Sequence, residues 1–234
     1  MSDLPQPQSP EPAPKKPRKS PAAQDQETAN TINTVRARLL AIRGNAEAVT
    51  RLEPRGYGAA GLAEGLDKVD TAQAKFDVRQ QAMQAEDSAA ACFKTIEREA
   101  RAGYKGFTTI AARVLADAPA ARDAVVIPAR ELRDQDKFRT NVEAAYKAAL
   151  KDVAALAKLG KRGYDQAGVQ VELAKLTAMS QANADYAAAQ QAAKLALEER
   201  EAAYKALKAW WGEFHATAQV AFQGRSDLLG LLDA

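Results

Sequence analysis

Apolar residues recur along most of the chain at alternating spacings of three and four, which places them on one face of an α-helix. The first series consists of Ile32, Val35, Leu39, Ile42, Ala46 and Val49. This series predicts a helix over residues 26–52 that packs along another helix, as in a coiled coil. No segment alternates apolar and polar residues for long enough to form a strand. The sequence therefore predicts an all-α protein.

The same pattern predicts three further helices, over residues 59–117, 131–159 and 166–223. In the second helix it is clearest in the series Phe93, Ile96, Ala100, Gly103, Phe107, Ile110 and Val114. Pro54, Pro119 and Pro128 each stand where a helical pattern stops, as expected of a residue without an N–H donor. Pro54 separates the first two predicted helices, and Pro119 and Pro128 separate the second from the third.

Residues 1–24 differ in composition from the rest of the chain. They contain seven of the ten prolines, interleaved with Lys15, Lys16, Arg18 and Lys19. Such a segment cannot bury enough apolar surface to offset the entropy lost on ordering. Residues 1–24 are therefore predicted to be a disordered, proline-rich basic tail.

A repeat emerges when the sequence is aligned with itself so that Arg55 falls on Arg162. Arg55-Gly56-Tyr57 then matches Arg162-Gly163-Tyr164, and Phe107 matches Phe214. Because alanine-rich helices match by chance, the argument rests on this turn and on the aromatic residues. The repeat predicts a duplicated helical hairpin, in which each glycine forms a left-handed C-terminal cap.

The duplication divides the chain into a tail (1–24), a first hairpin (25–118), a linker (119–130) and a second hairpin (131–234) that ends in a leucine-rich segment. Two hairpins can bury their apolar faces against each other as a four-helix bundle. Because the second arm of each hairpin is much longer than the first, either the long arms bend near Gly103–Gly106 or the bundle is elongated.

Three features that could indicate chemistry lack the residues that the chemistry needs. Residues 56–61 match G-x-G-x-x-G, but the preceding segment is a predicted helix and not the strand of a dinucleotide-binding unit. His215 is the only histidine, and we expect it to be a partly exposed helical residue. Cys92 is the only cysteine, and we expect it to be a small buried apolar residue. No catalytic, cofactor-binding or metal-binding residue is predicted, and we expect a cytoplasmic protein.

Two groups of residues are candidates for contacts with other molecules. Lys15, Lys16, Arg18 and Lys19 could contact phosphates or anionic lipid, although four basic residues beside Asp3 and Glu11 would bind weakly and in a salt-sensitive way. The alternative is that the tail only solubilises or tethers the protein. At the other end, we expect Trp211 to be in the core and Trp210 to be exposed. The candidate interaction residues there are Trp210, Leu228, Leu229, Leu231 and Leu232.

The C-terminal segment Trp211-x-x-Phe214-x-x-x-Ala218-x-x-Ala221, followed by Leu228-Leu229, resembles the ending of an uncharacterised group of bacterial helical proteins. In that group a Trp-x-x-Phe helix leads to a closing Leu-Leu-Glu-x-Leu-Gly, whereas Gly230-Leu231 stands here in the later part of that pattern. The resemblance covers little more than this segment. It implies a helical bundle and no assigned activity.

Together these features predict a non-enzymatic helical scaffold or protein-interaction protein, which binds an unknown protein partner or itself. One alternative is weak nucleic-acid binding through the basic tail. Another is a membrane-active helical protein that opens its hairpins into a bilayer, although the apolar stretches are short and flanked by charges. No apolar segment is long enough to be a predicted transmembrane helix.

Overall fold

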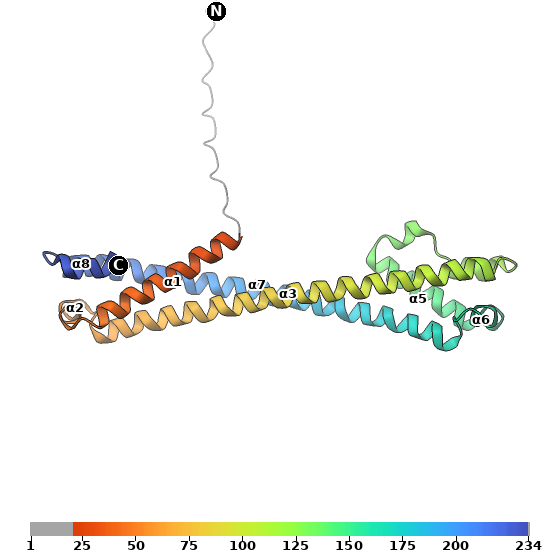
Figure 1. The fold of residues 1–234 in the computed structure, drawn as a ribbon, viewed down its shortest axis with the longest axis horizontal. Coiled ribbons are helices and arrows are strands. Elements are labelled where there is room, and N and C mark those ends of the chain that lie inside the picture. The colour runs from red at the N-terminus through yellow and green to blue at the C-terminus, as the bar shows by residue number, and fades with distance from the viewer. Residues whose placement is uncertain (1–20, 234) are drawn as a thin grey trace, which may run out of the picture. The chain divides into compact units, whose positions relative to one another are not determined.

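The computed structural model describes residues 21–233, and within them it contains helices and turns but no strand (Figure 1). This confirms the predicted all-α bundle. The elements are α1 (Pro21–Arg43), α2 (Ala46–Leu52), the 3-10 helix η1 (Glu53–Arg55), α3 (Ala59–Val114), α4 (Pro119–Val125), the 3-10 helix η2 (Ala129–Leu132), α5 (Gln135–Lys151), α6 (Val153–Gly160), α7 (Gln166–Ala221) and α8 (Ser226–Asp233).

The prediction of one continuous helix over residues 26–52 is wrong, because α1 ends at Arg43 and α2 begins at Ala46. Asn45 has an extended backbone, and its side chain accepts a hydrogen bond of 3.1 Å from the backbone N–H of Ala48. An asparagine in this conformation is a helix N-cap, which starts a new helix.

The predicted helix over residues 131–159 is divided in the same way. Asp152 caps α6 by accepting a hydrogen bond of 2.9 Å from the N–H of Ala155. The alignment that places Arg55 on Arg162 also places Asn45 on Asp152. The two breaks therefore occur at equivalent positions of the proposed repeat.

Two segments outside the four predicted helices are also helical. The predicted linker contains α4 and η2, and the leucine-rich segment forms α8. Residues 1–20 of the predicted tail lie outside the described residues. Residues 21–24 form the first turn of α1, so the helix begins before the predicted tail ends. Proline is suited to this first position, because the N–H that it lacks would have no partner within the helix.

The two long helices, α3 and α7, each contain 56 residues and lie close to their predicted ranges. Both follow a turn whose glycine has a positive φ, 81° at Gly56 and 89° at Gly163. In each turn the next residue donates its N–H over 3.2 Å to a leucine carbonyl, Tyr57 to Leu52 and Tyr164 to Leu159. α3 continues as a helix through Gly103–Gly106, without a break there.

The chain folds into two compact units. Unit 1 is the described part of residues 1–76 and 201–234, and unit 2 is residues 77–200. These units do not coincide with the two predicted hairpins. Unit 1 combines the start of the first hairpin with the end of α7, and unit 2 combines the end of α3 with the start of the second hairpin. The hairpin boundaries predicted at residues 118 and 131 therefore fall inside unit 2.

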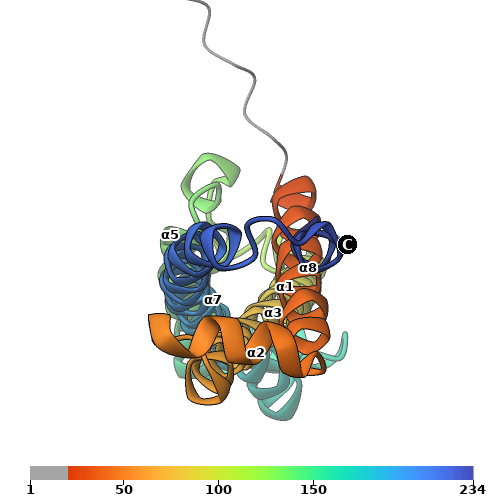
Figure 2. The same ribbon diagram turned by 90° about the vertical axis from the view of Figure 1, so that its left-hand side faces the viewer.

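The core of unit 1 is formed by α1, α2, the start of α3, the end of α7 and α8. In Figure 2, α1 and α8 lie side by side, and contacts between the two helices agree with this view. The fully buried large side chains include Ile32, Leu39, Leu62, Phe214 and Phe222. The predicted series from Ile32 to Ile42 thus faces the core.

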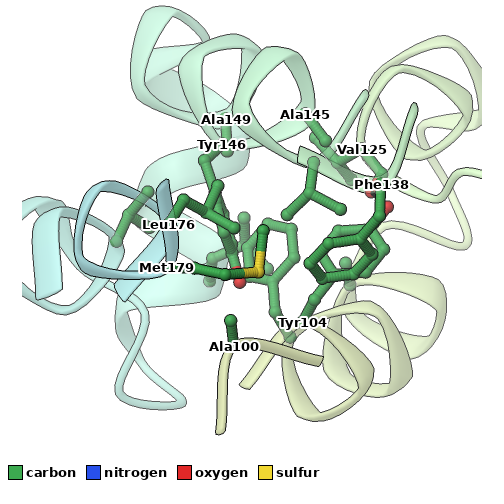
Figure 3. Close-up of a cluster of buried hydrophobic side chains, with 14 of the residues drawn as sticks. Ala100, Tyr104, Val125, Phe138, Ala145, Tyr146, Ala149, Leu176 and Met179 are labelled. Carbon is green, nitrogen blue, oxygen red and sulfur yellow. Dashed lines mark hydrogen bonds between the residues drawn. The ribbon is translucent and has the colours of Figure 1, made fainter. Parts of the chain in front are cut away.

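Aromatic side chains dominate the core of unit 2 (Figure 3). Tyr146 of α5 meets Tyr104 and Phe107 of α3 edge to face, with centroid distances of 5.8 Å and 5.0 Å. Phe138 and Met179 complete this layer. Edge-to-face pairs contribute beyond the area that they bury, so this layer fixes α5 against α3.

Candidate functional site

The two adjacent tryptophans are arranged oppositely to the prediction. Trp210 is only 8% exposed and belongs to the core of unit 1. Trp211 is partly exposed. Trp210 is therefore not a surface residue available to a partner, and the prediction that Trp211 is in the core while Trp210 is exposed is wrong.

The reason lies on α3. A Cβ atom added to Gly65 would overlap the outer edge of the Trp210 ring, so the ring occupies space that only a glycine leaves open. The ring also stacks on Phe214 at 5.1 Å and meets Tyr57 edge to face at 5.9 Å. In the sequence, Gly65 was the only indication that Trp210 is buried, and Gly65 lies far from Trp210 along the chain.

The four leucines predicted to dock a partner instead pack on the chain itself. Leu228 and Leu232 of α8 are each 1% exposed, and Leu229 and Leu231 are partly buried against the same core. Their helical spacing turns one face of α8 towards α1. The basic residues Lys15, Lys16, Arg18 and Lys19 lie outside the described residues.

The remaining candidate in unit 1 is an open groove with a volume of about 670 Å³. One wall is a face of α1, which presents among others Asn30, Thr31, Thr34 and Val35, and the other wall is Trp211 of α7. The centroid of the Trp211 ring lies 5.4 Å from that of Phe214 and 5.7 Å from that of His215. The groove therefore places the Trp211 side chain beside the polar side chains of α1.

The equivalent position in unit 2 is closed. Tyr104, which the repeat aligns with Trp211, is 3% exposed. Its hydroxyl donates a hydrogen bond of 2.9 Å to the carbonyl of Val125 and accepts one of 3.0 Å from the N–H of Ile127. Burial raises the pKa of this phenol, which keeps it protonated as a donor. The segment that follows α4 is thus held over Tyr104.

A second difference between the units lies at Thr31. The residue equivalent to Thr31 is Phe138, which is 2% exposed in unit 2. The guanidinium of Arg101 lies 4.3 Å above the Phe138 ring and donates a hydrogen bond of 2.8 Å to the carbonyl of Leu132. At the smaller Thr31, the hydroxyl instead accepts a hydrogen bond of 3.2 Å from Tyr204. Unit 1 therefore places the aromatic ring of Tyr204 beside Thr31, where unit 2 has the ring of Phe138 itself.

The groove carries charges of both signs, because Glu27 and Arg38 also line it. The arrangement suits the binding of a peptide chain, because it combines an aromatic wall with polar side chains along a helix.

The other features singled out in the sequence give no additional site. His215 is a partly exposed helical residue, as predicted. Cys92 is exposed, so its predicted burial is wrong. It precedes Phe93, which faces the core, and it therefore points away from that core. Among residues 21–233 there is no cluster of three or more histidine, cysteine or acidic side chains that could hold a metal ion.

The turn containing Gly56 joins two helices and follows no strand. A Cβ on Gly61 would overlap the carbonyl oxygen of Gly56, and the same holds for Gly168 and Gly163. These glycines allow close backbone approach within the turn, which accounts for the match to G-x-G-x-x-G without a nucleotide.

Unit 2 also buries polar atoms. The hydroxyl of Tyr146 and one carboxylate oxygen of Glu172 have no hydrogen-bond partner among the described residues. The other oxygen of Glu172 accepts a hydrogen bond of 2.7 Å from Lys175. Burial, followed by the negative charge of Glu172, raises the pKa of Tyr146. These groups belong to the aromatic core described above.

Within residues 21–233, no helix combines the length and the apolar character that a bilayer span requires. No protein-family model matches the chain, and comparisons with curated proteins and with solved structures give no match. The functional argument therefore rests on the residues of the groove.

Proposed function

We propose that this protein is a non-enzymatic helical scaffold that binds a partner protein through the groove between α1 and Trp211. The observation that carries this proposal is the contrast between the two units. Tyr104 is covered by the chain's own segment, whereas Trp211 in the equivalent position lines an open groove. Partly exposed tryptophans beside a groove are frequent anchors of protein interfaces.

The proposal also includes a duplication of the helical hairpin. It is supported by the equivalent caps at Asn45 and Asp152 and by the equivalent turns at Gly56 and Gly163. Tyr57 meets Phe214 at 5.3 Å and Tyr164 meets Phe107 at 5.2 Å, both edge to face and both between matching positions. One of two similar halves could then keep a closed groove while the other binds a partner.

The test compares the full chain with the variant Trp211→Ala. Both are immobilised and exposed to extracts of the source cells, and captured proteins are quantified by mass spectrometry. Each candidate is then purified, and its affinity for both forms is measured by calorimetry. We expect a protein that binds the wild type directly and loses about tenfold or more in affinity with Trp211→Ala.

The matched control is Val220→Ala, since Val220 lies on the same helix and is 61% exposed. This variant should retain the partner, and circular dichroism should show that all three forms are equally helical. If every directly binding protein is retained equally by Trp211→Ala and by the wild type, the groove is not the binding site. Binding that disappears at moderate salt with Trp211 unchanged would point instead to contacts of the basic tail.

A further inference from the structure

We infer that steric complementarity at two contacts selects the partner of each helical hairpin. It makes the first hairpin (residues 25–118) pair with the second (residues 131–234) of the same chain, and it prevents either hairpin from pairing with its own copy in another molecule. This inference rests on the duplication included in the proposed function, and it does not depend on the groove. It concerns which surfaces of two hairpins can associate.

Each unit contains one contact between the long helices α3 and α7 at which a glycine faces a large side chain. In unit 1, Gly65 of α3 faces the ring of Trp210, which is 8% exposed. In unit 2, Gly103 of α3 faces the carboxylate of Glu172, whose side chain is 12% exposed. A Cβ atom on either glycine would overlap the side chain that it faces. The first hairpin therefore supplies both glycines, and the second supplies both large side chains.

The two contacts join equivalent positions of the repeat. The alignment that places Arg55 on Arg162 also places Gly65 on Glu172 and Gly103 on Trp210. The position of Gly65 thus meets the position of Trp210 in unit 1, and the same two positions of the repeat meet in unit 2. Two copies of a single hairpin could bring these positions together in the same way.

The neighbouring aromatic contacts do not distinguish pairing within one chain from self-pairing. Tyr57 meets Phe214 at 5.3 Å, and Tyr164 meets Phe107 at 5.2 Å. Two first hairpins would place Tyr57 on Phe107, and two second hairpins would place Tyr164 on Phe214. Both arrangements again join a tyrosine to a phenylalanine. Without a further difference, each hairpin could associate with its own copy in another molecule.

The glycine contacts provide this difference. In a pair of second hairpins, Glu172 would face Trp210 at both contacts, and even its Cβ atom would overlap the ring. The carboxylate would also lose water beside an apolar ring, which carries a desolvation penalty. In a pair of first hairpins, Gly65 would face Gly103 and leave a cavity at both contacts. Only the first and second hairpins together fill both contacts without overlap, so the arrangement disfavours the wrong partner.

The experiment exchanges residues between equivalent positions of the full-length chain. The first exchange combines Gly65→Glu with Glu172→Gly. Within one chain, the new glutamate would overlap Trp210, and Gly103 would face a glycine. Between two copies, the new glutamate would face Gly103 and the new glycine would face Trp210, which reproduces the native contacts. After refolding from urea, we expect a molar mass by light scattering about twofold or more above that of the wild type, which should have the mass of one chain.

A second exchange, Gly103→Trp with Trp210→Gly, should raise the molar mass for the same reason. The decisive variant carries both exchanges. Its first hairpin has both large residues and its second hairpin has both glycines, so pairing within one chain is complementary again and self-pairing is not. We expect this variant to return to the mass of one chain. A general loss of stability cannot produce this return, because four substitutions would then cause more association than two.

The matched control exchanges the adjacent residues, Glu64→Val with Val171→Glu. These residues are also equivalent in the repeat, and both are more than half exposed. The control should keep the mass of one chain. Association of the control would show that any exchange between the repeats is sufficient, which would overturn the inference.

Two other results would also overturn it. One is either two-residue exchange at the glycine contacts keeping the mass of one chain, whether circular dichroism shows that variant to be folded or unfolded. The other is association of the variant with both exchanges, because exposed apolar surface would then explain the higher mass. Capture of a partner through Trp211 is measured on proteins that contain none of these exchanges. Failure of the pairing inference therefore leaves the proposed groove standing, and failure of the groove leaves the pairing inference standing.

Discussion

Replacing Gly65 by alanine should destabilise unit 1, although alanine is the better helix former. A methyl group at this position would overlap the Trp210 ring, which is 8% exposed and stacks on Phe214. Overpacking of this kind costs about 1–3 kcal/mol. The gain in helix propensity, about 1 kcal/mol, is too small to reverse the sign.

The same change should be stabilising once the ring is removed. Trp210→Ala alone should cost about 3–5 kcal/mol, the range for truncating a buried aromatic residue. In that background, Gly65→Ala meets no ring and should recover about 1 kcal/mol through helix propensity. Gly65→Ala therefore changes sign between the two backgrounds, and the coupling between the two positions should equal the overpacking cost of roughly 1–3 kcal/mol.

The four proteins of this cycle can be compared by urea unfolding, with the helical signal of circular dichroism as the probe. Tryptophan fluorescence is unsuitable because two of the four proteins lack Trp210. Trp211→Ala is the control, and it should cost much less than Trp210→Ala because Trp211 is partly exposed. If Gly65→Ala has the same effect with and without Trp210, the ring does not rest on Gly65 and the explanation of its burial is wrong.

Three further predictions concern other contacts. Tyr104→Phe should lower stability by about 1–3 kcal/mol and speed proteolysis of residues 126–134, because the hydroxyl holds this segment; unchanged cleavage would contradict that role. Asn45→Ala and Asp152→Ala should each cost about 1 kcal/mol in urea unfolding, whereas the alternative cap in Asn45→Asp should cost little. A hydrogen bond from Arg225 lowers the pKa of Glu47 in the folded protein. The stability that this hydrogen bond adds is therefore complete above the ordinary pKa of 4.5, and it is lost as the pH falls through the lowered pKa. The melting temperatures of the wild type and Glu47→Gln should therefore differ at neutral pH and converge in acid; a constant difference would contradict the pairing.

The helices and the turns could be predicted because they depend on neighbouring residues. The three-and-four spacing from Ile32 onward determines which face of α1 is buried. The positive φ of Gly56 and Gly163 is one that glycine adopts at little cost, so the sequence Arg-Gly-Tyr at two matching positions indicates two equivalent turns. The helix caps at Asn45 and Asp152 could also have been predicted from the sequence, since both are strong N-cap residues at matching positions.

The groove and the burial of the two tryptophans could not be predicted, because they depend on residues that lie far apart in the sequence. Two helical faces of α7 were possible, one with Trp210 and one with Trp211, and Gly65 on another helix decides between them. The groove is lined by one face of α1 and by Trp211 of α7, and the apolar positions along a single helix do not show which helices far apart in the sequence meet.

The two halves also show why an alignment of single positions is misleading for Trp210. Trp210 matches Gly103 in the alignment, and glycine has no side chain. This position alone therefore indicates no buried counterpart for the Trp210 ring. Its neighbour Gly65 matches Glu172, however, and a Cβ on Gly103 would overlap the Glu172 carboxylate just as one on Gly65 would overlap the Trp210 ring. Each unit therefore pairs one glycine with one large side chain, Gly65 with Trp210 in unit 1 and Gly103 with Glu172 in unit 2. In the proposed repeat, the position that holds the glycine in one unit holds the large side chain in the other. Close packing constrains the combined volume of the glycine and the large side chain that face each other. Whether a large side chain at one position is buried can therefore be predicted only when the residue that faces it is known.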